Sequence, residues 1–192
     1  MEFDNSFEVP LAPQEAWAVL MDIPRIAPCM PGAELTEIVD TQNFKGKISV
    51  RLGPVALAFA GRVEFDGIDA ANHTARVKAQ VSDAKGRGAA NATATFRIEP
   101  AASGSEVLIH TDLTLSGAVA QYGRGVGMIQ VTAAQLVGQF AGNLRAQLGQ
   151  EESVASHDAP PPPSAARPIS GLSLLVRVIW SRFAGLFSRR RI

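Results

Sequence analysis

Residues 117–148 form the stretch that most constrains what this chain can fold into. Its apolar side chains recur at steps of three or four residues, at Tyr122, Val126, Ile129, Ala133, Leu136, Phe140 and Leu144. That spacing places them on one face of an α-helix, and polar side chains occupy the opposite face, at Arg124, Gln130, Gln135 and Arg145. A helix of about thirty residues is roughly 45 Å long. We therefore predict that the rest of the chain supplies one broad apolar surface for this helix to cover.

Glycines interrupt the start of this helix. Gly123, Gly125 and Gly127 lie in its first turns, and each costs a helix about 1 kcal/mol relative to alanine. Two explanations stay open. One is close packing against a sheet or a frayed first turn, and the other is a site kept open for a ligand. The G-x-G-x-G run is not a dinucleotide-binding fingerprint, because no strand follows the helix to complete a βαβ unit.

Short strands fill most of the chain before the helix. Alternating apolar side chains predict strands at residues 3–9, 35–40, 44–52, 55–65, 75–81, 90–98 and 107–115. Pro13, Trp17 and Leu20 predict a short helix over residues 13–21, and one more helical turn is expected over 25–29. The predicted fold is α+β, a seven-stranded curved antiparallel sheet that grips a long C-terminal helix, with two short helices after the first strand.

The predicted inner face of the sheet carries small side chains. Five alanines fall on the inward phase of the two middle strands, at Ala75, Ala79, Ala90, Ala92 and Ala94. Protein interiors fill to a packing density of about 0.74, so small residues that face a glycine-rich helix mean either a close approach or a void. A curved sheet cannot approach a straight helix along its whole length, which favours an apolar ligand cavity. The residues predicted to bind the ligand are Phe59, Val63, Ala79, Ala92, Ala94, Tyr122, Gly125, Val126 and Ile129.

Motifs that carry catalysis are missing from the sequence, which has no G-x-S-x-G, H-E-x-x-H, C-x-x-C or P-loop pattern. His73, His110 and His157 fall in a turn, on an outward strand position and in a linker, so no metal site is predicted. Cys29 is either a reactive thiol near a helix end or a small buried hydrophobe. Tyr122 either offers its hydroxyl to a carbonyl-bearing ligand or is a core aromatic. We predict no catalytic residue and no required cofactor, and a hydrolase or cyclase that uses the cavity is the least favoured alternative.

Charge is divided unevenly between the two parts of the chain. The totals balance at 18 basic and 18 acidic residues, but residues 159–192 hold six arginines and no acid, so the body before them has 12 basic and 18 acidic residues. A basic tail on an acidic body indicates a membrane surface or an acidic partner, and it disfavours nucleic-acid binding by the body. The single cysteine excludes an internal disulfide, and Glu2 and Asp4 do not fit a secretion signal, so a cytoplasmic location is expected.

Composition changes twice near the C-terminus. A globular domain is predicted at residues 1–149, a Pro-rich flexible linker at 150–168 and an amphipathic helix at 169–192. The apolar arc of this last helix consists of Leu172, Leu175, Val176, Ile179, Trp180, Phe183, Leu186 and Phe187, and Arg189, Arg190 and Arg191 follow it. The sixteen residues from Leu172 to Phe187 span about 24 Å, less than the roughly 30 Å of a hydrocarbon core, so the helix is expected to lie in the membrane interface. A groove on a partner protein would fit the same arc.

Four local motifs carry a resemblance to a known family: Cys29-Met-Pro-Gly32, the segments 47–54 and 115–124, and the tail segment 171–183. They resemble the CoxG-like family of carbon monoxide dehydrogenase subunits, within the START-like helix-grip (SRPBCC) superfamily, and the tail is similar to that of the family's longer members. The positions that fall on the family pattern are Cys29, Pro31, Gly32, Gly53, Pro54, Gly117 and Gly123. None of these is an agreed catalytic residue of the family.

The resemblance implies a non-enzymatic accessory protein that recruits a molybdenum hydroxylase of the carbon monoxide dehydrogenase type to the inner face of the cell membrane. Family members have also been proposed to hold a quinone, so the alternative is a carrier that passes electrons from this enzyme to the membrane quinone pool. The expected partners are the enzyme, an anionic membrane surface and a small apolar ligand. The acidic body is expected to meet a basic patch on the enzyme.

Overall fold

The computed structural model describes the backbone of residues 1–52, 55–124 and 126–157, with the side chains of 122–126 and 152–157 outside the description. Contacts within the chain divide it into two units, Met1–Ser153 and Val154–Ile192. The account below concerns the first unit. The amphipathic segment predicted at 169–192 and most of the linker predicted at 150–168 lie outside the described residues.

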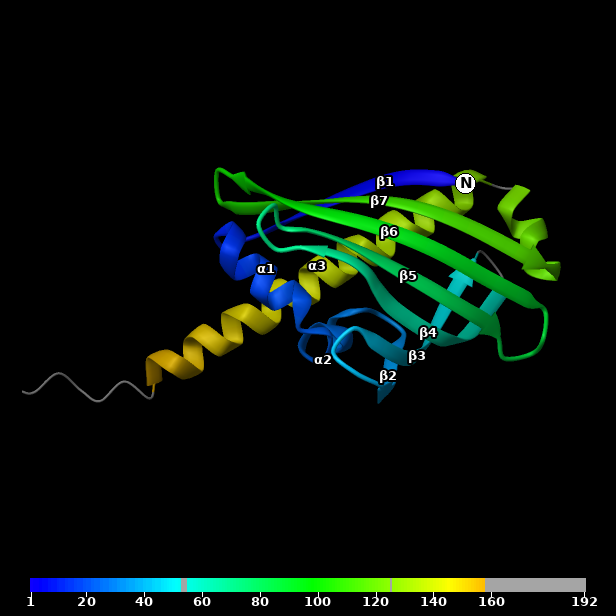
Figure 1. Ribbon diagram of the computed structural model, residues 1–192, viewed down its shortest axis with the longest axis horizontal. Helices are drawn as coiled ribbons and strands as arrows, with labels where there is room; N and C mark the ends of the chain where they lie inside the picture. The colour runs from blue at the N-terminus through cyan, green and yellow to red at the C-terminus, as the bar shows by residue number, and fades with distance from the viewer. Residues whose placement is uncertain (53–54, 125, 158–192) are drawn as a thin grey trace, which may run out of the picture. The chain divides into compact units, whose positions relative to one another are not determined.

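Seven antiparallel strands form one sheet, in the order β1-β7-β6-β5-β4-β3-β2 (Figure 1). The strands are β1 (Glu2–Val9), β2 (Ala33–Ile38), β3 (Asn43–Leu52), β4 (Val55–Asp69), β5 (Thr74–Asp83), β6 (Gly88–Ala101) and β7 (Gly104–Gly117). The helices are α1 (Pro13–Met21), α2 (Ile23–Ile26) and α3 (Val126–His157), with 3₁₀ turns η1 (Ala27–Cys29) and η2 (Ala118–Arg124). The predicted α+β fold is therefore confirmed, including the short helices after the first strand.

The sheet bends most strongly on the side of β2, β3 and β4. The pairing register shifts at Leu35/Glu37 and again at Phe65/Gly67, as expected for β-bulges. Gly46 and Gly61 face each other across β3 and β4. A methyl group on Gly61 would overlap the carbonyl oxygen of Gln80, so this close approach of neighbouring backbones requires glycine.

Helix α3 differs from its prediction at both ends. The segment predicted as one helix over 117–148 begins with the 3₁₀ turn η2, and α3 starts only at Val126. Gly117 explains this difference, because its φ of 68° ends β7 in the left-handed region that glycine adopts freely. At the other end α3 runs to His157, so the prediction of an extended linker from residue 150 is wrong for 150–157. Glutamate and alanine favour helix there, and the first proline comes only at Pro160.

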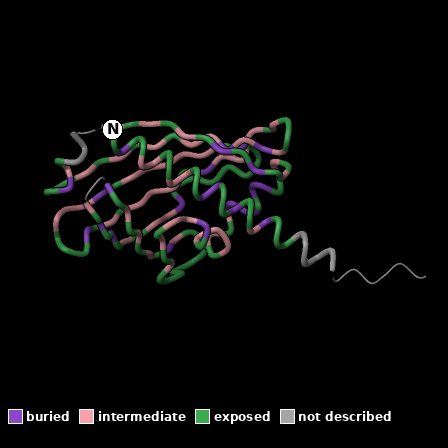
Figure 2. Tube along the Cα trace, turned by 180° about the vertical axis from the view of Figure 1, so that it is seen from behind, coloured by how far each residue is buried: buried purple, intermediate pink, exposed green. Residues whose placement is uncertain are grey.

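The C-terminal half of α3 packs against the main hydrophobic core. Phe140, Leu144 and Leu148 are buried there, and the Phe140 ring meets the Phe7 ring edge to face at a centroid distance of 5.6 Å. Residues of α1, β1 and the inner face of the sheet complete the cluster, including Trp17, Leu20, Val9, Phe65, Ala75, Ile98 and Val107. The C-terminal part of the predicted apolar stripe thus packs against the sheet, and buried positions alternate with exposed ones along this helix (Figure 2).

Beside this apolar stripe, a row of polar side chains fixes α3 to the turn formed by α2 and η1. Asn143 Nδ2 donates to the Cys29 carbonyl at 2.9 Å, Gln147 Nε2 donates to the Arg25 carbonyl at 3.4 Å, and Glu151 forms an ion pair with Arg25. Cys29 is buried, and its Sγ donates to Gln147 Oε1 at 3.0 Å. Burial, and then the charge of Glu151, raise the pKa of the Cys29 thiol. These contacts favour the interpretation of Cys29 as a buried hydrophobe over a reactive thiolate.

Several glycines lie on the exposed face of α3, at Gly127, Gly138, Gly142 and Gly149. No atom lies within 4 Å of a Cβ built on any of them. We predict that Gly138→Ala raises the free energy of unfolding by about 0.5–1 kcal/mol, because alanine loses less backbone entropy in a helix. Urea denaturation measures the change. The matched control is Gly61→Ala, which is expected to destabilise the protein. A loss of stability in Gly138→Ala would show instead that this face is covered in solution.

Candidate ligand-binding cavity

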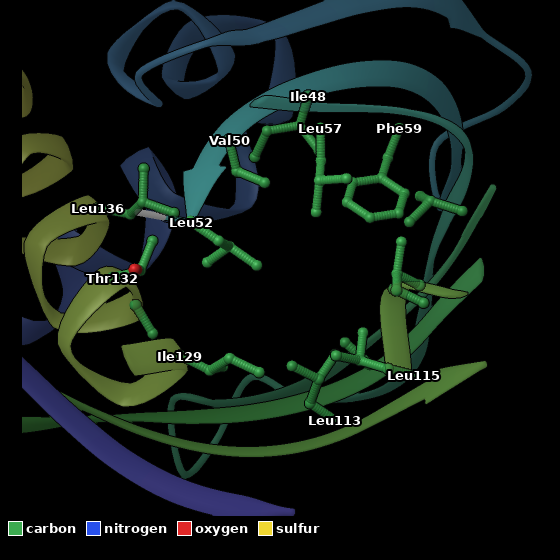
Figure 3. A pocket seen from close by; sticks show the side chains of 15 residues that line it. Ile48, Val50, Leu52, Leu57, Phe59, Leu113, Leu115, Ile129, Thr132 and Leu136 are labelled. Atoms are coloured by element: carbon green, nitrogen blue, oxygen red, sulfur yellow. The ribbon is translucent and has the colours of Figure 1, made fainter. Parts of the chain in front are cut away.

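An apolar cavity of about 300 Å³ lies between the inner face of the sheet and the first turns of α3. Strands β3 to β7 form one wall and α3 forms the other (Figure 3). The lining residues are Ile48, Val50, Leu52, Leu57, Phe59, Val81, Ala90, Ala92, Leu113, Leu115, Val119, Ile129, Thr132, Ala133 and Leu136. This volume is at the lower end of the range of small-molecule sites, about 300–1,000 Å³.

The cavity exists because this half of α3 does not reach the sheet. Ala90 and Ala92 on β6 and Ala133 on the helix all line the space, and these side chains are too short to fill it. Leu52, Leu57, Phe59, Ala90 and Val119 form a second hydrophobic cluster here, separate from the main core. The side chains labelled in Figure 3 converge on one open space rather than interdigitating. The predicted void between small residues is thus present, but at the end of the sheet away from Phe7 and Phe140.

Hydrogen-bonding groups are almost missing from the described cavity wall. Thr132 carries the only polar side chain among the residues that line it. Its Oγ1 donates to the Met128 carbonyl of its own helix at 2.8 Å, so the hydroxyl proton is already used. A ligand with one large apolar part therefore fits the described wall well. A polar group of the ligand would find no hydrogen-bond donor there, and its burial would weaken binding.

An ion pair lies at the β5–β6 turn, where Asp83 pairs in register with Phe59 of the cavity wall. Asp83 is buried and accepts hydrogen bonds from Arg87 Nε and Nη2, both at 2.8 Å, and from the Lys85 backbone N at 3.0 Å. The Arg87 side chain lowers the pKa of the Asp83 carboxyl well below its usual range. Arg87 also donates from Nη2 to the Ala56 carbonyl at 3.1 Å, and its own carbonyl accepts from Val119 N at 3.1 Å. This clamp thereby joins β4, the β5–β6 turn and η2.

The structure places the predicted ligand-binding residues in three groups. Phe59, Ala92 and Ile129 line the cavity. Val63 and Ala79 pair with each other in mid-sheet and lie outside its wall, while Ala94 lines a smaller hollow of about 220 Å³ next to Phe140. Gly125 and the side chains of Tyr122 and Val126 fall outside the description, so the two interpretations of Tyr122 both stay open.

Several residues of the cavity wall escaped the sequence analysis. Leu113 and Leu115 on β7 and Val119 on η2 line the cavity, as do Ile48, Val50 and Leu52 on β3. The alternation along β3 and β7 did predict that their apolar side chains face inward. No sequence pattern indicated which end of the strands the helix would leave uncovered.

The histidines do not form a metal site among the described residues, where no group of three or more His, Cys, Asp or Glu side chains could hold an ion. His73 Nε2 shares a hydrogen bond with Gln14 Oε1 at 2.9 Å. His110 Nδ1 lies 2.7 Å from Asp4 Oδ1 on the outer face of the sheet, and this contact raises the pKa of the His110 imidazole. The His157 side chain is outside the description.

A family model matches residues 6–149. This range includes most of α3 and every strand of the sheet, except for the first residues of β1. Its description names CoxG, the G subunit of carbon monoxide dehydrogenase. This chain belongs to the CoxG family. The match spans both the main core and the cavity, and it ends before the basic C-terminal segment. A comparison with curated proteins gave no match.

Solved structures with the same fold come from several bacteria. A conserved protein from Geobacillus kaustophilus superposes with a TM-score of 0.68 at 18% identity, covering 79% of this chain and 97% of that one. TTHA0849 from Thermus thermophilus superposes with a TM-score of 0.55 at 14% identity, covering 76% of this chain and 98% of that one. The Zhui aromatase/cyclase from Streptomyces sp. R1128 superposes with a TM-score of 0.54 at 12% identity, covering 81% of this chain and 95% of that one. At these identities the likeness extends to the helix-grip fold alone.

We predict that Ala92→Leu fills the cavity with little loss of stability. The extra methylenes occupy space that is already open, so the free energy of unfolding should change by less than about 1 kcal/mol. The variant should also lose binding of the neutral apolar fluorophore N-phenyl-1-naphthylamine, measured by its fluorescence increase.

The control for this variant is Ala75→Leu, at a position that is 1% exposed and belongs to the main core. Overpacking there should cost about 1–3 kcal/mol. If Ala92→Leu is destabilised as much as Ala75→Leu and the wild type never binds the fluorophore, the space is not a ligand cavity.

Proposed function

We propose that this CoxG-family chain is a non-enzymatic accessory protein that recruits a molybdenum hydroxylase of the carbon monoxide dehydrogenase type to the cytoplasmic membrane. The observation that carries the proposal is the family match over residues 6–149, followed by a C-terminal segment of different composition. The family name supplies the class of partner enzyme. The basic, amphipathic tail supplies the membrane attachment.

The described residues support a role without catalysis. Among the described residues that line the cavity, none is an acid, a base or a nucleophile apart from Thr132, whose hydroxyl proton is bonded within the helix. A catalytic site would need titratable groups placed within reach of a bound substrate. The cavity therefore suits binding better than chemistry.

Attachment through the tail rests on apolar burial together with charge. None of the helices among the described residues combines the length and apolar character that a membrane span requires. Burying each large side chain of the arc from Leu172 to Phe187 contributes about 1.5–3 kcal/mol, but ordering about sixteen residues costs a similar total. Because these two terms nearly cancel, Arg189, Arg190 and Arg191 determine whether the tail binds. Each basic residue near an anionic surface contributes about 1 kcal/mol to the binding free energy. The attachment should therefore select the anionic inner leaflet, where the protein would be peripheral.

Removal of residues 169–192 tests the adaptor. We expect the truncated protein to fold and to remain in the soluble fraction, together with the partner enzyme, when membranes are sedimented. A matched variant with Arg189, Arg190 and Arg191 changed to serine should keep partial attachment that weakens further as salt rises. Flotation of the isolated tail with anionic liposomes separates lipid binding from docking on the enzyme. If the tail does not float without the enzyme, direct anchoring is wrong.

The cavity favours a second candidate function, which is compatible with the first. We propose that the domain carries an apolar ligand such as a quinone, which would take electrons from the partner enzyme and deliver them to the membrane pool. The support is the apolar wall of the cavity and its volume of about 300 Å³. Because the described wall offers no hydrogen-bond donor, the isoprenoid chain of a quinone fits it better than the polar ring.

Native mass spectrometry of membrane-purified protein tests the carrier. We expect a bound apolar molecule that organic extraction releases and that is missing from Ala92→Leu purified in the same way. A wild-type domain that is empty and takes up no added quinone would exclude the carrier and leave the adaptor standing.

A further inference from the structure

We propose that a cationic groove on the outer face of β3 and β4 binds the phosphate groups of anionic membrane lipids, which places the end of the domain that contains the cavity against the membrane. The groove measures about 380 Å³ and is lined by Ser49, Val50, Arg51, Ala56, Leu57, Ala58, Lys85 and Arg87. This inference rests on the proposed carrier function and specifies where the ligand would be exchanged. It concerns residues of the globular domain and not the C-terminal tail.

The groove and the cavity lie on opposite faces of one hairpin. Val50 pairs with Leu57, and both border the groove as well as the cavity. Their neighbours Arg51 and Ala56 pair one step closer to the β3–β4 turn, with side chains on the outer face. Figure 3 shows Val50 and Leu57 pointing into the cavity. A lipid bound in the groove would thus be separated from the apolar cavity by the thickness of a single sheet.

The floor of the groove is open because its outward side chains are small. Ala56, Ala58 and Ser49 present no bulk above the backbone, and Ser49 adds a hydroxyl group. The β5–β6 turn forms one side, held against β4 by a hydrogen bond from Ala84 N to the Ala58 carbonyl at 2.7 Å. The Asp83–Arg87 clamp fixes the same turn. The shape of the groove is therefore set before any ligand binds.

The charges in the groove are unbalanced, whereas several other cations of the outer face have carboxylate partners. Lys45 pairs with Glu37 at 2.9 Å, and Lys78 pairs with Asp66 at 3.0 Å. The Arg87 charge is matched by Asp83. Arg51 and Lys85 are both exposed, and among the residues that the structure describes neither has a carboxylate within ion-pair distance. Two positive charges thus remain for an anion.

Lipid phosphate is the occupant that this arrangement favours over a soluble anion. Two cations spaced across a groove on the surface match the phosphates of an anionic bilayer. An apolar ligand of the cavity, on the other side of the same hairpin, must come from an apolar phase and return to one. A membrane surface supplies both the phosphates and that apolar phase.

The test compares full-length proteins that all keep the same tail. The variant is Arg51→Glu with Lys85→Glu. The control is Lys47→Glu with Arg62→Glu, which makes the same change in net charge on the outer face of the same two strands, away from the groove. Each protein is loaded with N-phenyl-1-naphthylamine and mixed with phosphatidylcholine vesicles that contain a quencher lipid, with or without phosphatidylglycerol.

We expect the groove variant to transfer the fluorophore to anionic vesicles about tenfold more slowly than the wild type, and this difference should vanish at high salt. Fluorophore affinity and tail-dependent flotation should not change, and the control should transfer at the wild-type rate. Equal transfer rates in all three proteins would overturn the proposal while leaving the carrier function intact. A wild type that never binds the fluorophore would instead contradict the carrier function.

Hydrogen exchange gives a readout that does not depend on the fluorophore. Anionic vesicles should slow amide exchange at residues 49–52, 55–58 and 84–87 in the wild type and in the control, and not in the groove variant. Absence of this protection in the wild type overturns the groove as a lipid site. Equal protection by inorganic phosphate alone would also overturn it, since the site would then bind free anions.

Discussion

The burial of one curved apolar sheet face by a single straight helix determines the rest of this structure. Phe140 and Leu144 meet the sheet through Phe7 and the main core, so the C-terminal half of α3 has one possible depth and rotation. The polar row from Asn143 to Glu151 fixes the same half to the α2 turn. With one half of the helix held in this way, the other half must diverge from a sheet that curves. The cavity at Ile129 and Ala133 is the space left between the helix and the sheet where the two separate.

An apolar space of this size has an energetic cost when it holds no apolar atoms. Engineered cavities lose about 24 cal/mol for each Å³ that remains unfilled, which gives on the order of 7 kcal/mol for about 300 Å³. The whole stability of a domain is typically about 5–15 kcal/mol. Ala90 and Ala92 keep a space that leucines could fill. A domain that retains this space against such a cost is well suited to bind an apolar molecule.

The sequence predicted the strands and their inward faces because alternation is a local property. Three of the predicted ligand-binding residues, Phe59, Ala92 and Ile129, line the cavity for the same reason, and their binding of a ligand stays a prediction. Leu113, Leu115 and Val119 were missed because no sequence pattern indicates which end of the strands the helix leaves uncovered. Val63, Ala79 and Ala94 were predicted on the inward phase of their strands, but Val63 and Ala79 lie outside the cavity wall and Ala94 lines the smaller hollow next to Phe140. Position along a strand relative to a helix is a tertiary property, and neither the strand pattern nor the helix pattern contains it.

The pairing of β1 with β7 has a consequence for how the chain folds during synthesis. The Met1 amine donates to the Leu113 carbonyl, 112 positions away, so the first strand of the sheet to be synthesised has no neighbour until the last strand emerges. Helix α3 follows later still, and until then the apolar face of the sheet has no cover. Such distant contacts make folding slow, and transiently exposed strands are prone to aggregate. During translation this protein should therefore depend on chaperones that shield an unfinished sheet.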